Sequence, residues 1–226
     1  MRYHDDIEYA LSTFNTKRRL SSLDDNAISK LSDGIPPSLL EFISSESRTE
    51  FHDGLFRMCN PLEFQPILAL IFRSDRDLRH DECRVIGYTA FGDLYVWSNR
   101  IFRVRIALAE GLVFSTRLVN PGMPAPQSID GFAAGMIPDR ENADFEDVDG
   151  LPLYNRCQAM HGPLEDDECY GFFPALALSG IAGPSRVVEN IRRVKALEHF
   201  SILAQLTVFN LAAPRGGEII LYRPIG

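Results

Sequence analysis

The fold of this chain is decided by residues 85–119, which read VIGYTAFGDLYVWSNRIFRVRIALAEGLVFSTRLV. Four runs within this stretch are rich in β-branched and aromatic residues, as is typical of strands: 85–91, 94–97, 101–108 and 112–119. The segments between the runs favour tight turns: Gly92-Asp93, Ser98-Asn99-Arg100 and Glu110-Gly111. Because these segments are too short to hold a crossover helix, the four runs are expected to form an antiparallel meander.

The sequence before the meander is expected to be helical. Ile7, Leu11 and Phe14 are spaced so that they share one helical face, and Pro36-Pro37 can open a second, short helix. Asn60-Pro61 is typical of a helix start, because Asn caps free amides and Pro fits the first turn. These helices are expected to flank the sheet.

The last part of the chain is expected to hold one long helix. Ser185 is a suitable N-cap, and apolar residues then recur every three or four positions as far as Leu206. Before this helix, 162–168 is expected to be a turn that leads into one helical turn, and 171–180 a buried apolar run. The predicted fold class is therefore α+β: an antiparallel β-meander flanked by helices, with a long C-terminal helix packed on it.

A proline- and glycine-rich stretch, 121–138, separates the chain into two parts. It contains four prolines and three glycines, which indicates a linker. We therefore expect one α+β domain in 1–120 and a second domain in 121–226. The short linker and the apolar C-terminal helix are also compatible with one compact unit.

Length and composition are those of a globular protein, with 226 residues, 45% of them hydrophobic and 24% charged. No apolar run reaches the roughly 18 residues that a membrane span needs. The charged residues 1–6 lack the apolar segment of a secretion signal, so we expect a cytoplasmic protein with no membrane contact. Four cysteines match no zinc-binding spacing and are expected to be buried, reduced thiols: Cys59, Cys83, Cys157 and Cys169.

The charge of the chain is acidic and concentrated in one region. The net charge of −8 argues against direct binding to nucleic acid, which requires a basic face. Residues 130–168 hold 11 acidic side chains against Arg140 and Arg156, a net −9, so the rest of the chain sums to +1. This acid-rich region is either an ordinary solvated surface or a surface that attracts a basic partner.

Motifs of common enzyme sites are missing from the sequence. It contains no P-loop, no Gly-x-Gly-x-x-Gly, no Gly-x-Ser-x-Gly and no His-Glu-x-x-His. His161 lies four residues before Glu165, but one histidine near one acid is a weak signal for catalysis or metal binding. We expect no catalytic residue, no metal site and no cofactor.

Several motifs do carry a resemblance to a known family. Residues 162–180, GPLEDDECYGFFPALALSG, and 195–206, KALEHFSILAQL, resemble the C-terminal part of type VI secretion DNase-immunity proteins. Three upstream motifs resemble the GAD-like domain that precedes it in that family: DGLF (53–56), CNP (59–61) and TAFGDLYVW (89–97). The departures are mild, with Cys169 in place of a larger apolar residue and Ser179 in place of glycine.

The resemblance implies a GAD-like domain in 1–120, an immunity-type domain in 121–226, and an inhibitor rather than an enzyme. Its partner would be a cognate DNase effector toxin, bound and neutralised in the cytoplasm of the producing cell. Because a DNase must attract DNA, its active face is expected to be basic, and an acidic inhibitor can be steered there.

The expected toxin-binding residues come from the acid-rich region, with two aromatic residues as apolar anchors. They are Asp139, Glu141, Asp144, Phe145, Glu146, Asp147, Asp149, Tyr154, Glu165, Asp166 and Asp167. For 165–168, stabilisation of a helix end is an alternative role.

Three other functions stay open at this point. The first is a non-catalytic regulatory module that binds a ligand or peptide. The second is a hydrolase that uses His161 with the acids of 165–168. The third is an antitoxin against another class of toxin.

Overall fold

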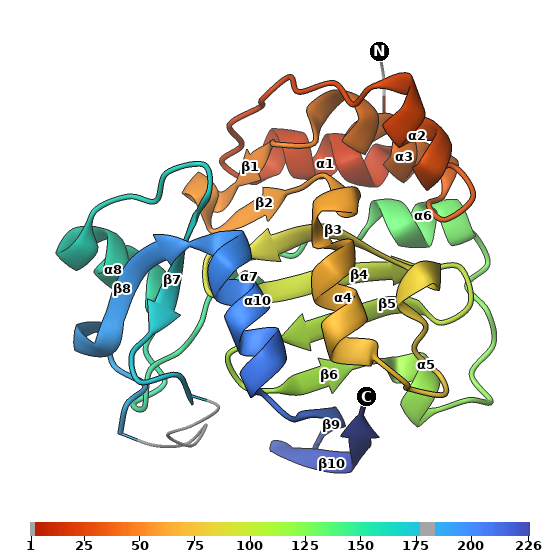
Figure 1. Cartoon of the computed structure of the whole chain (residues 1–226). Helices are drawn as coiled ribbons and strands as arrows, with labels where there is room; N and C mark the ends of the chain where they lie inside the picture. The colour runs from red at the N-terminus through yellow and green to blue at the C-terminus, as the bar shows by residue number, and fades with distance from the viewer. Residues whose placement is uncertain (1–2, 177–183) are drawn as a thin grey trace.

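The structure is a computed structural model that describes residues 3–176 and 184–226. Its centre is an eight-stranded sheet in the order β1-β2-β3-β4-β5-β6-β9-β10 (Figure 1). Neighbouring strands are antiparallel except β6 and β9, which are parallel. The strands are β1 (Glu50–Phe51), β2 (Phe56–Met58), β3 (Cys83–Thr89), β4 (Asp93–Ser98), β5 (Phe102–Ala107), β6 (Leu112–Phe114), β9 (Phe209–Arg215) and β10 (Glu218–Ile225). The predicted α+β class is confirmed.

The predicted meander is formed by β3 to β6. Gly92 and Gly111 occupy two of its turns with φ of +88° and +68°, where a larger residue would be strained. The last strand is shorter than expected, because β6 ends at Phe114 and α5 (Thr116–Val119) follows. Ser115 causes this change: its side chain accepts a hydrogen bond from the amide of Leu118 and caps the short helix.

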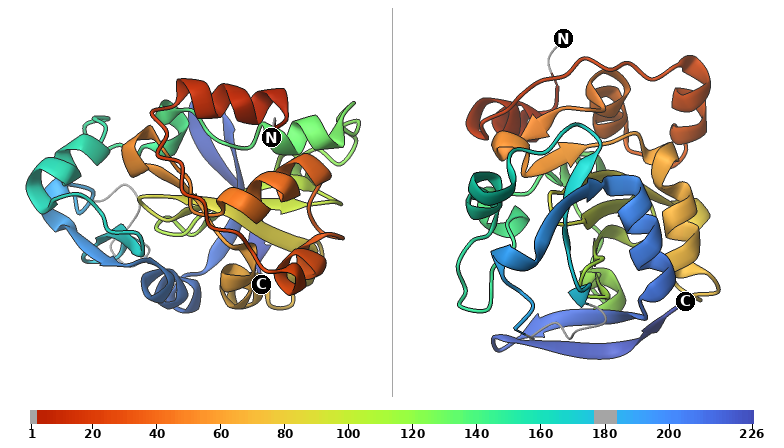
Figure 2. Two further views of the ribbon diagram at one scale, coloured as in Figure 1. Left: turned by 90° about the horizontal axis from the view of Figure 1, so that it is seen from above. Right: turned by 60° about the vertical axis from the view of Figure 1, so that its left-hand side comes forward.

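Helices cover both faces and one end of the sheet (Figures 1 and 2). On one face, Leu68 and Phe200 pack in a common core with Val96 of the sheet. On the other face, Trp97 and Ala133 belong to a second core. The described α-helices are α1 (Asp5–Thr13), α2 (Asp25–Leu31), α3 (Pro37–Glu46), α4 (Gln65–Phe72), α5, α6 (Ile129–Ala134), α7 (Arg140–Ala143), α8 (Tyr154–His161) and α10 (Ala196–Leu206). The 3-10 helices are η1 (His52–Gly54), η2 (Pro61–Phe64), η3 (His80–Glu82) and η4 (Val188–Asn190).

The segment between residues 162 and 195 differs most from the sequence-based expectation. No helical turn forms at 162–168; instead β7 (Glu168–Phe172) pairs antiparallel with β8 (Ile191–Lys195) in a separate two-stranded sheet. The last helix, α10, therefore begins at Ala196 rather than after Ser185. Apolar residues at 191 and 194 fit a helix as well as a strand, and pairing with β7 decides for the strand.

The apolar run expected to be buried is confirmed only in part. Gly171, Phe172 and Leu176 are buried, whereas Phe173 is 47% exposed. Residues 177–180 of that run lie outside the described residues.

The two halves of the chain share the large sheet. β6, which belongs to 1–120, pairs in parallel with β9, so that Val113 lies opposite Leu211. α10 also packs against α4 in the common core. The division into two domains at 120/121 stays a prediction, but the sheet and the core cross this boundary.

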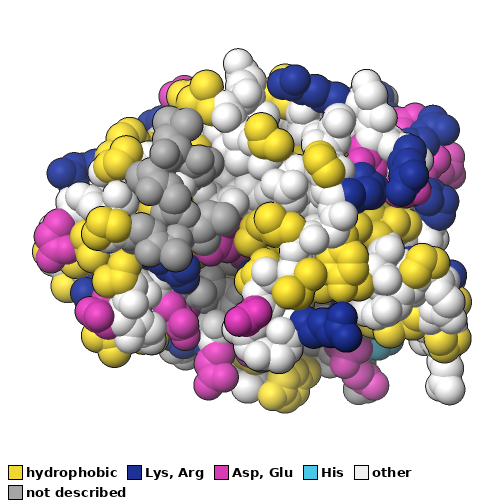
Figure 3. Space-filling model, turned by 90° about the horizontal axis from the view of Figure 1, so that it is seen from below, with side chains coloured by type: hydrophobic (Ala, Val, Ile, Leu, Met, Phe, Trp, Pro, Cys, Tyr) yellow, Lys and Arg dark blue, Asp and Glu magenta, His cyan; other side chains and the backbone are white. Residues whose placement is uncertain are grey.

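β10 is an edge strand of the large sheet, and four of its apolar side chains are exposed, whereas Ile225 at its end is buried. Four consecutive residues, Ile219, Ile220, Leu221 and Tyr222, are 37% to 58% exposed. Seen from below, hydrophobic side chains gather on this face of the molecule (Figure 3).

The four cysteines are buried free thiols, as expected. Burial raises the pKa of Cys83 and Cys157 to about 12, so these thiols stay protonated at neutral pH. Within 3–176 and 184–226, no helix has the length and apolar character that a membrane crossing needs.

Candidate functional site

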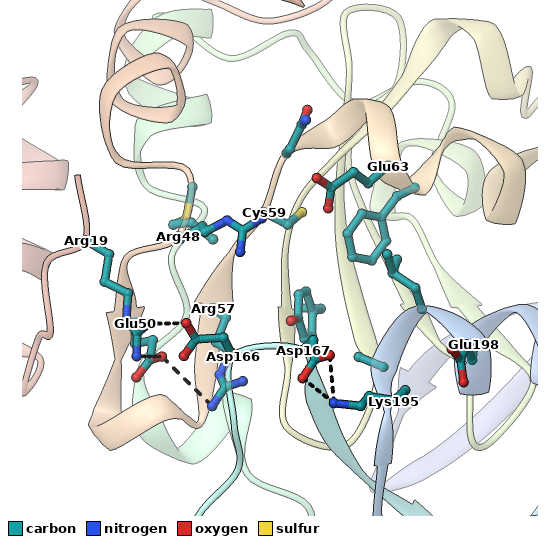
Figure 4. Close-up of a pocket in the computed structure, with 16 residues that line it drawn as sticks. Arg19, Arg48, Glu50, Arg57, Cys59, Glu63, Asp166, Asp167, Lys195 and Glu198 are labelled. Carbon is teal, nitrogen blue, oxygen red and sulfur yellow. Dashed lines mark hydrogen bonds and ion pairs between the residues drawn. The ribbon is translucent and has the colours of Figure 1, made fainter. Parts of the chain in front are cut away.

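A cavity of about 460 Å3 opens where the two halves of the chain meet (Figure 4). We call it the junction cleft. From the N-terminal half, its lining includes Arg19, Arg48, Glu50, Arg57, Cys59, Glu63, Phe64 and Tyr88. From the C-terminal half come Asp166, Asp167, Lys195, Leu197 and Glu198. The volume lies within the range of about 300–1,000 Å3 that is usual for binding pockets.

Arg57, on β2, connects the two walls of the cleft. Its side chain is only 6% exposed, and its guanidinium lies 4.0 Å from the carboxylate of Glu50. It donates hydrogen bonds to the main-chain carbonyls of Leu164, Glu165 and Glu168, at 3.3 Å to the first and 3.4 Å to the last. The arginine therefore holds the 164–168 loop of the C-terminal half against the N-terminal half.

Two of the predicted toxin-binding acids, Asp166 and Asp167, line the cleft, but both are paired within the chain. Asp166 forms an ion pair with Arg19, which also lies 3.1 Å from Glu50. Asp167 lies 2.7 Å from Nζ of Lys195, and the hydrogen bond from this lysine lowers the pKa of the carboxyl group. Their negative charge is thus largely balanced by neighbouring cations.

Glu165 and Glu168 both lie beside Arg193 of β8. Glu168 accepts hydrogen bonds from Arg193 at 2.7 and 2.9 Å and one from the amide of Glu165 at 2.9 Å. Glu165 is 74% exposed, with its carboxylate 3.8 Å from Arg193. No helix begins at these acids, so the alternative role of stabilising a helix end is wrong.

Aromatic and aliphatic side chains also line the cleft. Phe64 and Tyr88 lie with ring centroids 5.5 Å apart, and Tyr88 packs edge-on against Phe200. Burial raises the pKa of Tyr88 to about 12, so its hydroxyl stays protonated. Leu197 of α10 is 38% exposed and lines the same cavity.

Two further carboxylates, Glu63 and Glu198, line the cleft, and the pKa of Lys195 is raised mainly by its hydrogen bond to Asp167 and also by the charge of Glu198. Glu63 lies in η2 and Glu198 in the first turn of α10. Neither side chain makes a hydrogen bond or ion pair with any residue in the described part of the chain. Neither glutamate was expected in a site, since single glutamates at helix starts carry no signal of their own.

The segment 139–149 uses several of its acids for its own structure. Asp139 caps α7 by accepting from the amide of Asn142 at 2.9 Å. Asp144 accepts from the amides of Phe145 and Tyr154, at 2.8 and 3.0 Å. Burial raises the pKa of the Asp144 carboxyl.

Asp147 is also engaged within the chain. It is 6% exposed, pairs with Arg156, and accepts hydrogen bonds from the amides of Asp149 and Leu151 at 2.9 Å each. The side chains of Glu141, Glu146 and Asp149 are exposed. These three, together with Asp139, which is exposed although its carboxylate caps α7, are the acids of the segment that are open to a partner.

The expected apolar anchors, Phe145 and Tyr154, do not project from the surface. They are 7% and 1% exposed and belong to the chain's own core. Phe145 packs on Phe172 with ring centroids 5.2 Å apart, and Tyr154 donates a hydrogen bond to the carbonyl of Asp53 at 2.7 Å. Phe145 also lies with its ring centroid 5.7 Å from that of Phe91 in the N-terminal half, so both rings help to join the two halves and their interpretation as surface anchors is corrected.

The turn at η1 forms a second contact between the halves. His52, Asp53 and Gly54 have φ of +54°, +62° and +92°, a conformation that is uncommon for the first two residues. His52 Nε2 lies 2.9 Å from the carbonyl of Pro138, and Arg140 donates to the carbonyl of His52 at 3.3 Å. These contacts hold the strained backbone in place.

Among the residues that the structure describes, His161 is not placed with the acids of 165–168 in an arrangement that would support hydrolysis. Its Nε2 lies 2.9 Å from the carbonyl of Val188, while the acids of 165–168 lie beside Arg19, Arg193 and Lys195. Within the described ranges, no group of three or more His, Cys, Asp and Glu residues is arranged to hold a metal ion.

Comparison with known proteins identifies the family. None of the curated proteins searched matches the chain. Among solved structures, the chain is similar to the crystal structure of Atu4351 from Agrobacterium tumefaciens, with 27% identity, 97% of each chain covered and a TM-score of 0.84. Residues 5–110 match the GAD-like domain, and residues 127–207 match the C-terminal domain of the type VI secretion immunity protein Tdi1. The chain therefore carries a GAD-like domain followed by a domain of the family of the C-terminal part of the type VI secretion immunity protein Tdi1.

Proposed function

We propose that this chain binds a cognate DNase toxin of a type VI secretion system in the cytoplasm and neutralises it by stoichiometric binding, without catalysis. The observation that carries this proposal is the match of residues 127–207 to the Tdi1 immunity domain. The likeness of the motifs in 162–180 and 195–206 to DNase-immunity proteins supports a DNase as the partner.

The charge of the chain supports the same partner. A DNase attracts a polyanion and so needs a basic active face, while this chain carries a net charge of −8. Glu141, Glu146 and Asp149 are exposed and free to attract such a face over distance. Asp144 and Asp147 contribute less, because their carboxylates are engaged by main-chain amides.

Co-expression with a candidate cognate DNase toxin of a type VI secretion system tests the proposal. Cells that make the nuclease together with this chain are expected to survive, and the two proteins are expected to copurify. An empty vector is the negative control, and a catalytically inactive nuclease shows that cell death comes from DNA cleavage. Death at the same rate with and without this chain, at equal protein levels, would contradict the proposal.

The junction cleft favours one second candidate function, a non-catalytic module that binds a small ligand. Its volume of about 460 Å3 and its mixed lining suit a small molecule. A metabolite that copurifies with the chain, together with failure to protect against the nuclease, would favour this candidate.

A further inference from the structure

We propose that the outer edge of β10 pairs antiparallel with β10 of a second copy of this chain, so that two copies form one continuous sheet. This surface is separate from the junction cleft, and the pairing does not depend on the nature of the toxin.

The open edge of β10 is the first argument. β10 is the last strand of the large sheet, and no described segment pairs with its outer side (Figure 1). The run from Ile219 to Tyr222 is apolar and 37% to 58% exposed, and hydrophobic side chains gather on this face (Figure 3). Lysine, proline and bulges commonly protect such an edge from association. Here the bulge at Tyr222 and Pro224 come only at the end of the run, so 218–221 keeps a free edge.

The turn before β10 decides which main-chain groups face outward. Gly216-Gly217 joins β9 to β10 with φ of +63° and +85°, which fits a two-residue hairpin loop. Arg215 and Glu218 lie opposite each other beside this loop, where such hairpins exchange two hydrogen bonds. Because the pattern alternates along the strand, Ile219 and Leu221 direct their N–H and C=O groups to the open edge.

These outward groups match themselves about a two-fold axis. When two β10 strands run antiparallel, Ile219 of each copy can exchange two hydrogen bonds with Leu221 of the other. The axis then passes beside Ile220, which meets Ile220 of the second copy. Each copy contributes the same residues, as in a symmetric dimer.

Charge favours a second copy over an unrelated strand. The apolar run is flanked by Glu218 before it and Arg223 after it. Glu218 is exposed, and Arg223 is held in place by Asp75 and Asp77 of its own chain. Antiparallel pairing brings the Glu218 end of each strand to the Arg223 end of the other. Opposite charges therefore meet at both ends of the interface, whereas parallel pairing would bring like charges together.

The other edge of the large sheet limits the assembly to two copies. Glu50 of β1 exchanges main-chain hydrogen bonds with Lys17 at 2.9 and 3.1 Å, and both residues of β1 are buried. Among the described strands of this sheet, β10 therefore has the open edge. One open edge for each copy gives a closed dimer and not a fibre.

The first experiment is sedimentation equilibrium of the full chain over a range of concentrations, which is expected to show a monomer–dimer equilibrium. Ile220→Lys places two like charges across the axis and is expected to raise the dissociation constant at least about tenfold. Leu20→Lys makes the same kind of change at a residue that is 85% exposed and near β1, and is expected to stay within about threefold. Thermal unfolding checks the folding of both variants.

Two results would overturn the proposal. One is a wild-type chain that stays monomeric at every concentration. The other is an equal dissociation constant for the two lysine variants. If β10 amides of a monomeric chain become protected from hydrogen exchange only when the nuclease is added, the edge belongs to the toxin and not to a second copy.

Disulfide trapping tests the register with two cysteine variants and does not depend on the lysine variants. Two copies of Ile220 across the axis have Cα atoms about 4.5 Å apart, which is within the range of a disulfide. Leu221 lies opposite Ile219 of the second copy, so its own counterpart is displaced by two residues, or about 7 Å along the strand, and is out of reach. The four native cysteines are buried and do not compete.

Mild oxidation is expected to convert the Ile220→Cys variant, but not the Leu221→Cys variant, to a covalent dimer on non-reducing electrophoresis. The absence of a covalent dimer from Ile220→Cys, or an equal yield from both variants, would contradict the proposal.

Discussion

The acid-rich segment 139–149 and the loop 165–168 look alike in the sequence, but the structure uses their charges differently. In the loop, acids are paired with cations, and Arg19 comes from the N-terminal half to meet Asp166. In 139–149, three acids accept hydrogen bonds from main-chain amides, and the other three, like Asp139 among the first, are exposed. The comparison teaches that the number of acids in a segment does not give the charge it offers to a partner.

The largest expected effect concerns the cation that holds the loop in place. Arg57→Ala removes a buried guanidinium that binds three carbonyls and neutralises Glu50. We expect a loss of about 2–4 kcal/mol in the free energy of unfolding, since three main-chain carbonyls lose a buried charged donor and Glu50 keeps only its ion pair with Arg19. Urea denaturation measures this, with Arg48→Ala, an exposed arginine of the same cleft, as the control. Equal stability of the two variants would show that the loop does not depend on Arg57.

The second prediction concerns the difference between acids of 139–149 that bind main-chain amides and acids that are only exposed to solvent. Asp144→Ala removes the acceptor for the amides of Phe145 and Tyr154, and is expected to cost about 1–2 kcal/mol of unfolding free energy. Glu141→Ala, at an exposed position, is expected to change it by less than about 0.5 kcal/mol. Thermal and urea unfolding of both variants measure the contrast. If Glu141→Ala costs as much as Asp144→Ala, the distinction between structural and free acids fails.

A third prediction concerns the exposed acids as a source of attraction. Reversal of charge at Glu141, Glu146 and Asp149 to lysine is expected to slow association with the nuclease by about tenfold at low salt. The difference should shrink at high salt, because ions screen exposed charges. Stopped-flow association at two ionic strengths measures it, with unfolding free energy as a check on folding. A rate that stays the same at low salt would remove these acids from the proposed steering.

The smallest effect is the pH dependence of the Asp167–Lys195 pair. The hydrogen bond from Lys195 lowers the pKa of Asp167 in the folded chain, so the unfolded chain binds the proton more readily. The stabilisation is therefore present above the unfolded pKa, near 4 for aspartate, and is lost as the pH falls through the folded value. Asp167→Asn should lose less stability than the wild type between about pH 5 and pH 2. The difference in unfolding free energy between the two proteins should be small, since exposed ion pairs contribute little to stability. Urea unfolding of both proteins at several pH values measures it.

The elements that the sequence predicted well are those with local causes. The meander follows from strand propensity and short glycine turns, and the helix start at Asn60 from a side-chain cap on the amide of Leu62 at 3.1 Å. The strand β8 was predicted as helix, because its apolar spacing fits both structures and its partner β7 lies far away in the sequence.

The candidate site could be predicted only in part. Asp166 and Asp167 were expected to bind the toxin and do line the junction cleft, but their pairing with Arg19 and Lys195 has no signature in the sequence. Glu63 and Glu198 could not be singled out, since each is an isolated glutamate far from the other along the chain. Phe145 and Tyr154 were read as anchors because aromatic residues near acids resemble a binding surface.

The sequence by itself determined the fold class, the meander, the resemblance to immunity proteins and the acidic character of the chain. These depend on local propensity, turn chemistry and composition, which neighbouring residues set. Only the tertiary structure decided which acids are neutralised and which stay exposed, because a charge is balanced by whichever groups lie within a few ångströms of it.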